Sequence, residues 1–316
     1  MQETHTNKHP NDLDDEIDLR LLFYVLWQGK WIIVSVTTFV SIMGVIISLL
    51  LPNIYVSKAL LAPVTSSSGI PAALQSYSGL AGLAGIRLPS GGDNSNSTQA
   101  IQKLSTLSFF ENNILPNIFL PDLMALESWD AQTNTLNYDE SIYNLKSNTW
   151  VDNPDSKNKL PSVQESFDAF GDLLGLNTDI KTGFISITIR HQSPFVAKEW
   201  VDLLINEVNY FYKQKDKSES ERAVSFLNEQ IAMTSLSEVK KVISELLKEE
   251  TQKLALIEAN DFYVFDFIDP PAVMEKKSEP QRSRISIVIA LLGGMLSVII
   301  VFTKYYLFKE EANQAS

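Results

Sequence analysis

The chain contains no cysteine, and its 316 residues include only three histidines, His5, His9 and His191. Without cysteine there are no disulfides, no thiolate zinc ligands and no thiol catalysis, while an oxidising compartment is permitted but not required. Three scattered histidines, two of them in a polar N-terminal tail, leave little material for a metal site or a catalytic triad. We therefore expect no catalytic, metal-binding or cofactor-binding residues, no cofactor and no enzymatic activity.

Positive charge is scarce as well, because 26 Lys and Arg stand against 38 Asp and Glu, a formal net charge of −12. Nucleic-acid binding needs a basic surface that neutralises phosphates, so we expect no nucleic-acid partner. Glycine and proline are missing from the whole of Phe195–Asn260. That absence predicts a long helical stretch, with a bend or restart near residues 234–237, where Ser235 and Glu238 have the spacing of a capping box.

Two uncharged apolar segments, Trp31–Leu51 and Ile285–Thr303, lie near the two ends of the chain. As a helix, each segment would reach about 30 Å, the thickness of the hydrocarbon core of a bilayer. The first is longer than the apolar core of a signal peptide, and its lead-in is acidic. Two crossings place both termini in one compartment and residues 52–284 in the other. Lys and Arg counts on the two sides tie, so they leave the orientation open.

The remaining segments predict an α+β domain. Asp14–Gln28 indicates an amphipathic helix lying on the membrane, after a polar tail at residues 1–12. Strands are expected over residues 54–62, 181–190 and 262–269, and shorter helices over residues 98–115 and 162–174. The Ser-, Gly- and Ala-rich residues 64–98 include GLAGLAG at 79–85, which lacks the Lys of a phosphate-binding loop and favours close packing. Residues 123–160 are expected to be irregular.

The first strand leaves one apolar segment and the last strand leads into the other, so we expect them to be neighbours in one sheet close to the membrane. The long helical stretch then projects away from that sheet as a stalk. In its second half Leu236, Val239, Ile243 and Leu246 recur at spacings of three and four, as in a helix of coiled-coil type. The fold class expected is an α+β membrane protein with two terminal transmembrane helices, an α/β base and a long helical stalk.

Small residues recur on one face of each apolar segment, which lets membrane helices approach closely. The alternative is that such residues are simply common in membrane helices. A substitution of Gly293 by Leu that left assembly and product length unchanged would count against pairing of the two faces. The residues expected in this packing are Thr37, Ser41, Gly44 and Ser48 in the first segment and Ser286, Ala290, Gly293, Gly294 and Ser297 in the second.

Several landmarks together resemble the Wzz family of chain-length determinants, the polysaccharide co-polymerases. They cover nearly the whole chain, and their order is more specific than any one of them. One departure is Met274, where relatives often carry Pro, in the linker that holds Pro270, Pro271 and Pro280 before the second apolar segment. The matching stretches are IDLRLLFYVLWQGKW (17–31), YVSKALLAP (55–63), SPFVAKEWVDLLINEVN (193–209) and YVFDFIDPPAVMEKKSEPQR (263–282).

The resemblance implies a Gram-negative inner membrane, cytoplasmic termini and a periplasmic domain. It also implies a homo-oligomeric ring, with an octamer as the expected size, that works with a Wzy-type polymerase on a lipid-linked glycan. The expected layout is a cytoplasmic tail (1–30), a transmembrane helix (31–51), a periplasmic domain (52–284), a second transmembrane helix (285–303) and a cytoplasmic tail (304–316). Within the domain the base comprises residues 52–192 and 261–284, and the helical region residues 193–260.

The leading hypothesis is a non-enzymatic scaffold that regulates the length of lipopolysaccharide O-antigen or a related surface glycan. An alternative is a co-polymerase for capsule or exopolysaccharide that depends on a separate tyrosine kinase, since the chain has no Walker motif and no Tyr-rich tail. A third is a tethered glycan-cleaving enzyme, which requires paired carboxylates in a cleft. Only the acidic residues 127–172, with Asp130, Asp139 and Glu140, offer material for it.

Overall fold

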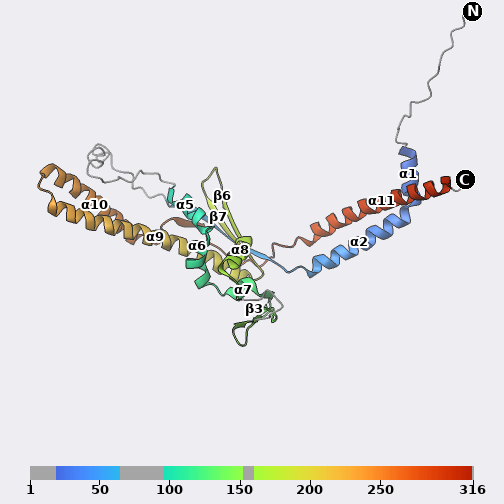
Figure 1. The fold of residues 1–316 in the computed structure, drawn as a ribbon, viewed down its shortest axis with the longest axis horizontal. Coiled ribbons are helices and arrows are strands. Elements are labelled where there is room, and N and C mark those ends of the chain that lie inside the picture. Colours follow the sequence, from blue (N-terminus) through green and yellow to red (C-terminus); the bar gives the residue numbers. More distant parts are fainter. Residues whose placement is uncertain (1–18, 65–94, 152–159, 315–316) are drawn as a thin grey trace, which may run out of the picture. The chain divides into compact units, whose positions relative to one another are not determined.

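A computed structural model describes residues 19–64, 95–151 and 160–314 of the chain (Figure 1). The predicted polar tail at residues 1–12 and the GLAGLAG stretch at 79–85 lie outside these residues. The chain divides into two compact units. The central unit comprises residues 53–278, and the terminal unit comprises residues 1–52 and 279–316.

The terminal unit consists of three helices, α1 (Leu19–Gln28), α2 (Lys30–Leu50) and α11 (Arg282–Gln314). Helix α1 covers the second part of the predicted interfacial helix, whose first residues, 14–18, lie outside the described chain. Helices α2 and α11 pack side by side along their length. The unit is therefore a helical hairpin in which the two partners are separated by the whole central domain in sequence.

The central unit contains a four-stranded antiparallel sheet in the order β6-β7-β1-β8. Strand β1 pairs with β8, so the first and last strands are neighbours, as predicted. The predicted strand at 262–269 is shorter in the structure. The strands are β1 (Tyr55–Pro63), β6 (Leu174–Thr178), β7 (Ile185–His191) and β8 (Phe265–Asp269).

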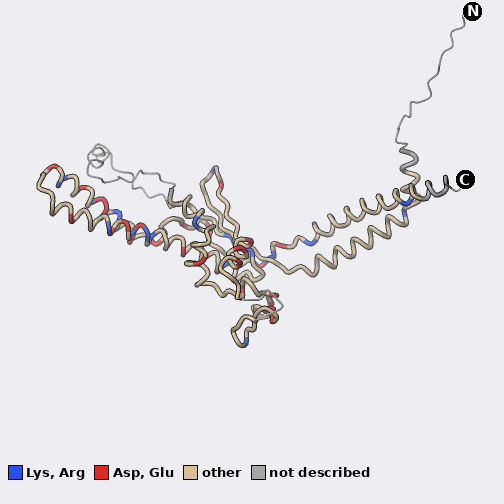
Figure 2. The backbone as a smooth tube through the Cα atoms, viewed as in Figure 1, with Lys and Arg blue, Asp and Glu red and all other residues tan. Residues whose placement is uncertain are grey.

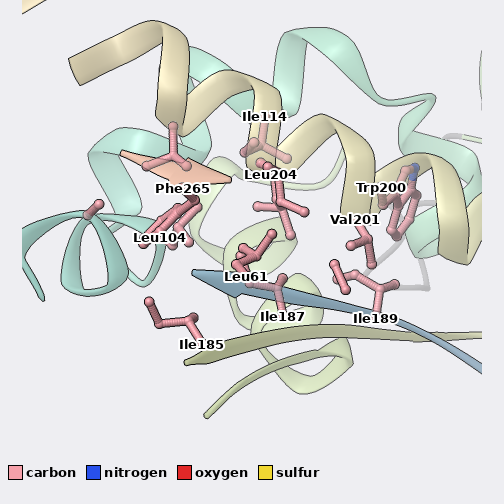
Figure 3. Close-up of a cluster of buried hydrophobic side chains, with 14 of the residues drawn as sticks. Leu61, Leu104, Ile114, Ile185, Ile187, Ile189, Trp200, Val201, Leu204 and Phe265 are labelled. Atoms are coloured by element: carbon pink, nitrogen blue, oxygen red, sulfur yellow. The ribbon is translucent and has the colours of Figure 1, made fainter. Parts of the chain in front are cut away.

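Helix α9 (Pro194–Met233) covers one face of this sheet with its first half. Alternation along β7 places Ile185, Ile187 and Ile189 on that face, where all three are buried, as their spacing predicts. Figure 3 shows Ile187 and Ile189 on the side of the sheet that faces Leu204 and Val201 of α9. The α9 helix begins where Ser193 caps it through its side chain and Pro194 occupies the first turn.

Asn209 joins α9 to the edge strand through four hydrogen bonds. Its Oδ1 accepts from the backbone N–H groups of Tyr263 (3.2 Å), Val264 (2.7 Å) and Phe265 (3.0 Å). Its Nδ2 donates to the carbonyl oxygen of Phe265 at 3.2 Å. The side chain is only 5 % exposed, so these bonds form where water does not compete strongly.

The second half of α9 pairs with α10 (Ser237–Ala259) in an antiparallel helical hairpin (Figure 1). Leu227, Ile243 and Leu246 are buried between the two helices. The predicted break is present, because α9 ends at Met233 and α10 starts at Ser237. The predicted capping box is wrong: Leu236 occupies the N-cap position, and no side chain caps the helix.

The helix predicted over residues 98–115 is interrupted. Thr106 adopts an extended backbone conformation, and its side chain accepts a hydrogen bond from the N–H of Phe109, so it ends one helix and caps the next. The resulting pieces are α5 (Ser95–Leu104), α6 (Leu107–Phe109), a π-helical turn η1 (Phe110–Ile114) and a 3₁₀ turn η2 (Leu115–Asn117). The predicted helix over 162–174 is confirmed as α8 (Val163–Leu173), with a capping box at Ser162 and Glu165.

The described part of residues 123–160 is more regular than predicted, because it forms two small hairpins after the short helix α7 (Leu120–Met124). Asn134 and Asn148 sit in the turns with φ of 51° and 55°, a conformation that Asn tolerates better than most residues. Strand β6 also escaped prediction. The hairpin strands are β2 (Leu126–Asp130) with β3 (Thr135–Tyr138), and β4 (Tyr143–Asn144) with β5 (Thr149–Trp150).

Three hydrogen bonds tie the two ends of the central unit together. Ser278 N–H donates to the carbonyl of Ile54 at 2.9 Å, and Lys277 Nζ donates to the side chain of Asn53 at 3.0 Å. Ser57 Oγ donates to the carbonyl of Ala272 at 3.1 Å. The domain is thus entered and left at one place.

His191 is buried at the end of β7 with both ring nitrogens bonded to backbone. Nδ1 accepts the N–H of Ser193 at 3.0 Å, so the proton lies on Nε2, which donates to the carbonyl of Asp122 at 3.1 Å. Burial lowers the pKa of His191. The side chain of Asp122 accepts a 2.6 Å hydrogen bond from the Tyr138 hydroxyl. The site holds a neutral imidazole.

Substituting Asn209 with Ala should destabilise the fold by about 2 to 4 kcal/mol, because it leaves buried backbone groups of residues 263–265 without their partner. Urea unfolding of the full chain in detergent, followed by the fluorescence of the buried Trp200, would measure this. Asn206→Ala, on an exposed position of the same helix, is the matched control. Equal unfolding midpoints for the two variants would contradict the role given to Asn209.

Acid should destabilise the fold through His191. Because its pKa is lower in the folded state, the unfolded chain takes up the proton first, and stability falls as the pH drops below about 6.5 toward the lowered pKa. His191→Leu should be less stable at pH 7.5 and lose this part of the pH dependence. Unfolding midpoints from pH 7.5 to 5 would test it, and the same pH slope in both proteins would refute it.

Candidate functional site: the contact between the two apolar helices

Two helical segments, Lys30–Leu50 and Arg282–Tyr305, are long and apolar enough to cross a membrane, with mean hydropathies of 2.4 and 2.8. Most of their surface is uncovered, since only 11 % and 17 % of the most apolar windows are buried. Large apolar side chains such as Phe39, Leu291 and Met295 are about two-thirds exposed. A helix in the core of a soluble domain would be mostly covered, so these two surfaces need an apolar surrounding.

Glycines allow the two helices to approach closely. A Cβ added to Gly44 would lie 2.5 Å from Cγ2 of Ile289, and a Cβ added to Gly293 would lie 2.9 Å from Cγ1 of Val40. Both distances are too short for real carbon contacts, so only glycine fits here without movement. The pairs also show that the helices run antiparallel, because residue numbers rise on α2 as they fall on α11.

Hydroxyl groups lie in the same contact. Thr37 Oγ1 donates to Ser297 Oγ across the two helices at 3.4 Å, and Ser297 Oγ donates to the carbonyl of Gly294 at 2.6 Å. Ser297 is fully buried, and so is Ser48, whose hydroxyl has no hydrogen-bond partner among the described residues. The contact therefore combines close carbon packing with one polar bridge.

The other residues expected in this packing have different surroundings. Ser41 and Ser286 donate within their own helices, to the carbonyls of Thr37 (2.7 Å) and Arg282 (2.9 Å). Ala290 is partly buried. An added Cβ on Gly294 would meet no atom within 4 Å, so Gly294 faces away from α2 while its neighbour Gly293 faces toward it.

The proline-bearing linker follows β8. Pro271 is buried and Pro270 is exposed, directly after the last strand residue, Asp269. The carbonyl of Pro280 accepts the N–H of Arg282 at the start of α11. Met274, which departs from the expected proline, is partly exposed. The prolines thus stand at the end of the sheet and at the beginning of the apolar helix.

Two of the acidic residues considered for hydrolysis, Asp130 and Asp139, accept hydrogen bonds within their own turns. Asp130 accepts from Gln132 N–H and Thr133 Oγ1, and Asp139 accepts from the N–H and hydroxyl of Ser141. These hydrogen bonds lower the pKa of both carboxyls. A general acid needs a raised pKa instead, so neither carboxyl suits that role.

Asp122 is the carboxyl in this region whose pKa is raised, chiefly by burial. Its side chain accepts a hydrogen bond from the Tyr138 hydroxyl. No group of three or more His, Cys, Asp or Glu able to hold a metal ion occurs in the part of the chain that the structure describes. No pattern in the sequence predicted the role of Asn209 or the hydrogen bonds that link Asp122 to Tyr138 and His191.

A Leu side chain at Gly44 should separate α2 from α11, whereas Leu at Gly294 should not, because a Cβ added to Gly294 would meet no atom within 4 Å. In the cysteine-free chain, a Thr37→Cys, Ser297→Cys pair should form an intrachain disulfide. We expect Gly44→Leu to reduce its yield several-fold on oxidation and Gly294→Leu to leave it unchanged. Gel mobility with and without reductant measures the yield, and equal yields would contradict the contact.

Comparison with known proteins gives a match to one family model, described as "Wzz: Chain length determinant protein", over residues 15–113. No curated protein matches the sequence. Among solved structures, a full-length bacterial polysaccharide co-polymerase is similar at 12 % identity and a TM-score of 0.40, covering 93 % of this chain and 99 % of its own.

A fragment of WzzB, a polysaccharide co-polymerase from Salmonella Typhimurium, is similar at 13 % identity and a TM-score of 0.30, covering 72 % of this chain and 100 % of its own. TM-scores this low carry no argument, so the assignment depends on the family model. That model spans two of the four stretches that resemble the family, residues 17–31 and 55–63. The similarity of this chain to the Wzz family of chain length determinants, predicted from its sequence, is therefore confirmed over residues 15–113.

Proposed function

We propose that this chain is a non-enzymatic regulator of polysaccharide chain length that acts as an oligomeric scaffold in the inner membrane of a Gram-negative bacterium. The observation that carries the proposal is the match of residues 15–113 to the Wzz chain length determinant family. The exposed apolar surfaces of α2 and α11 support it, because they need the surrounding that a bilayer provides.

In this proposal both helices span the membrane at residues 31–51 and 285–303. The tails at residues 1–30 and 304–316 lie in the cytoplasm, and residues 52–284 lie in the periplasm. The close contact at Gly44 and Gly293 supports an intrachain role for the small residues, in which they hold the two spans together. The prolines of the linker connect the sheet to the second span.

The partners in the proposal are further copies of the chain, in a ring of about eight by analogy with the family, a Wzy-type polymerase and its lipid-linked glycan. The scaffold then determines how long the polymerase extends each glycan, either lipopolysaccharide O-antigen or a related surface polymer. The binding and positioning of partners, and not a reaction, is the activity assigned to the chain.

Deleting the gene should change the length distribution of the surface polysaccharide while polymer is still made. Electrophoresis of the extracted glycan would show the loss of a preferred length, and expression of the wild-type chain from a plasmid should restore it. An unchanged distribution after deletion would overturn the proposal. Cleavage of polymer by the purified chain would also overturn it, because the proposal assigns no hydrolysis.

A further inference from the structure

The two edges of the four-stranded sheet differ in how well they are protected. Strand order places β8 at one edge and β6 at the other. An open edge is a template for pairing with another chain, and proteins blunt such edges with charges, prolines and irregular pairing. Strand β8 has all three devices. Asp266 and Asp269 are exposed, Pro270 follows directly, and the pairing with β1 shifts register between Leu60 and Leu61.

Strand β6 has none of these devices. No Lys, Arg, Asp, Glu or Pro occurs from Leu174 to Thr178, so the strand is tan along its whole length in Figure 2. Its pairing with β7 keeps one register, from Leu174 opposite Ile189 to Thr178 opposite Ile185. An uncharged strand with regular pairing is the kind of edge that accepts a further strand.

The ladder identifies the backbone groups that β6 directs outward. Asp179 N–H donates to the carbonyl of Phe184 at 2.9 Å, so this pair is hydrogen-bonded across the hairpin. Hydrogen-bonded and non-hydrogen-bonded pairs alternate along an antiparallel ladder. The N–H and C=O groups of Leu176 and Thr178 therefore point away from β7. In the part of the chain that the structure describes, no backbone group pairs with them there.

An apolar hollow of about 300 Å³ lies beside this edge. Leu104 and Phe170 in its wall are only 3 % and 2 % exposed, so the hollow reaches the domain core. No charged residue lines it, and its size suits a large apolar side chain. The lining residues are Leu104 and Ser105 at the end of α5, Phe167, Phe170 and Gly171 of α8, and Leu174 and Leu176 of β6.

Gly171 leaves the hollow open without a packing reason inside the described chain. A Cβ added to Gly171 would meet no atom within 4 Å. By contrast, a Cβ added to Gly175 would overlap Oγ1 of Thr188, so the sheet itself requires glycine there. Because glycine is less favourable than alanine in a helix, its presence in α8 is explained if a group from outside the described chain enters the hollow.

We infer that the outer edge of β6 binds an extended segment of another protein, which adds a further antiparallel strand to the sheet. Leu176 and Thr178 would exchange hydrogen bonds with the backbone of that segment. Directly opposed residues lie on the same face of a sheet, so the partner residue opposite Leu176 would direct its side chain to the hollow. Backbone pairing would provide affinity, and the hollow would select Leu or a similarly large apolar residue.

A polypeptide matches both features of this site. A hydrocarbon chain from a lipid would fill the hollow but leave the outward N–H and C=O groups of Leu176 and Thr178 without partners. An extended peptide presents donors and acceptors at the spacing of the strand and an apolar side chain on one face. The inference does not depend on the proposed control of glycan length.

A short fluorescent peptide tests the pairing with full-length protein in lipid nanodiscs. The peptide alternates threonine with valine and carries leucine at its centre, so one face of its strand is apolar. Fluorescence anisotropy should show saturable binding. With leucine opposite Leu176, the leucine and valine amides face β6. Methylating these nitrogens should weaken binding at least about tenfold, whereas methylating the threonine amides should not.

Two substitutions in the chain test the two parts of the site separately. Gly171→Leu fills the hollow. Thr178→Pro removes an outward N–H and keeps the ladder to β7, because proline is tolerated where an edge N–H faces solvent. Each should weaken binding of the peptide at least about tenfold. Gln164→Leu, on an exposed position of α8 outside the lining, and Thr178→Val are the matched controls and should bind as the wild type does.

Absence of saturable binding, equal binding of the two methylated peptides, or equal binding by all variants would overturn the inference. A changed mass of the assembly for Thr178→Pro without peptide would also overturn it, because the edge would then be a contact between copies of this chain. The methylated peptides need no substitution in the chain, so a variant that fails to fold does not weaken the test. None of these outcomes concerns glycan length, so the proposed function can fail or stand independently.

Discussion

The amide of Asn209 is the interaction on which the central unit depends. The edge strand β8 follows a long helical excursion, and its beginning must be brought back to the sheet. One side chain does this by accepting three consecutive backbone N–H groups and donating to a carbonyl. Buried backbone N–H groups destabilise the fold when they lack a hydrogen-bond partner, and the Asn209 side chain supplies that partner at one position only. It therefore determines where the returning chain ends and where strand β8 begins.

Asn209 also lies close to the point where α9 changes the element that it packs against. Before it, Val201, Leu204 and Ile205 are fully buried against the sheet. Beyond Tyr212, which still belongs to the domain core, the buried residues of α9 are Ser220 and Leu227, and Leu227 packs against α10. One unbroken helix of 40 residues thus belongs first to a domain core and then to a two-helix hairpin. No loop separates the two parts, so the direction of the hairpin is set by the packing on the sheet.

Patterns with a strong period were predictable from the sequence. The alternation at Ile185, Ile187 and Ile189 and the pairing of the first strand with the last are present in the structure. Features decided by one polar side chain were not. Thr106 breaks a helix that its neighbours favour, and Asn134 and Asn148 build turns in a segment with no clear period.

The candidate site shows the same limit. The spacing of small residues within each apolar segment places Gly44 and Gly293 on one face of their own helices. It does not predict which residue of the other helix lies opposite each glycine. Asn209 resembles any polar residue on a helix until the strand 54 to 56 residues later lies against it. The residue opposite each glycine and the hydrogen-bond partners of Asn209 are both set by tertiary contacts between residues far apart in the sequence.

The bonds that join residues 53–57 to residues 272–278 have a mechanical consequence. Strands β1 and β8 run antiparallel, so tension applied between the two connecting segments would act at the same end of both strands. Load would be taken first by the bond from Ser278 to Ile54 and then by the ladder, one rung after another, as in the opening of a zipper. The packing of α9 on the sheet would stay intact while the hydrogen bonds between β1 and β8 break. The place where the chain enters and leaves the domain would therefore open first under load.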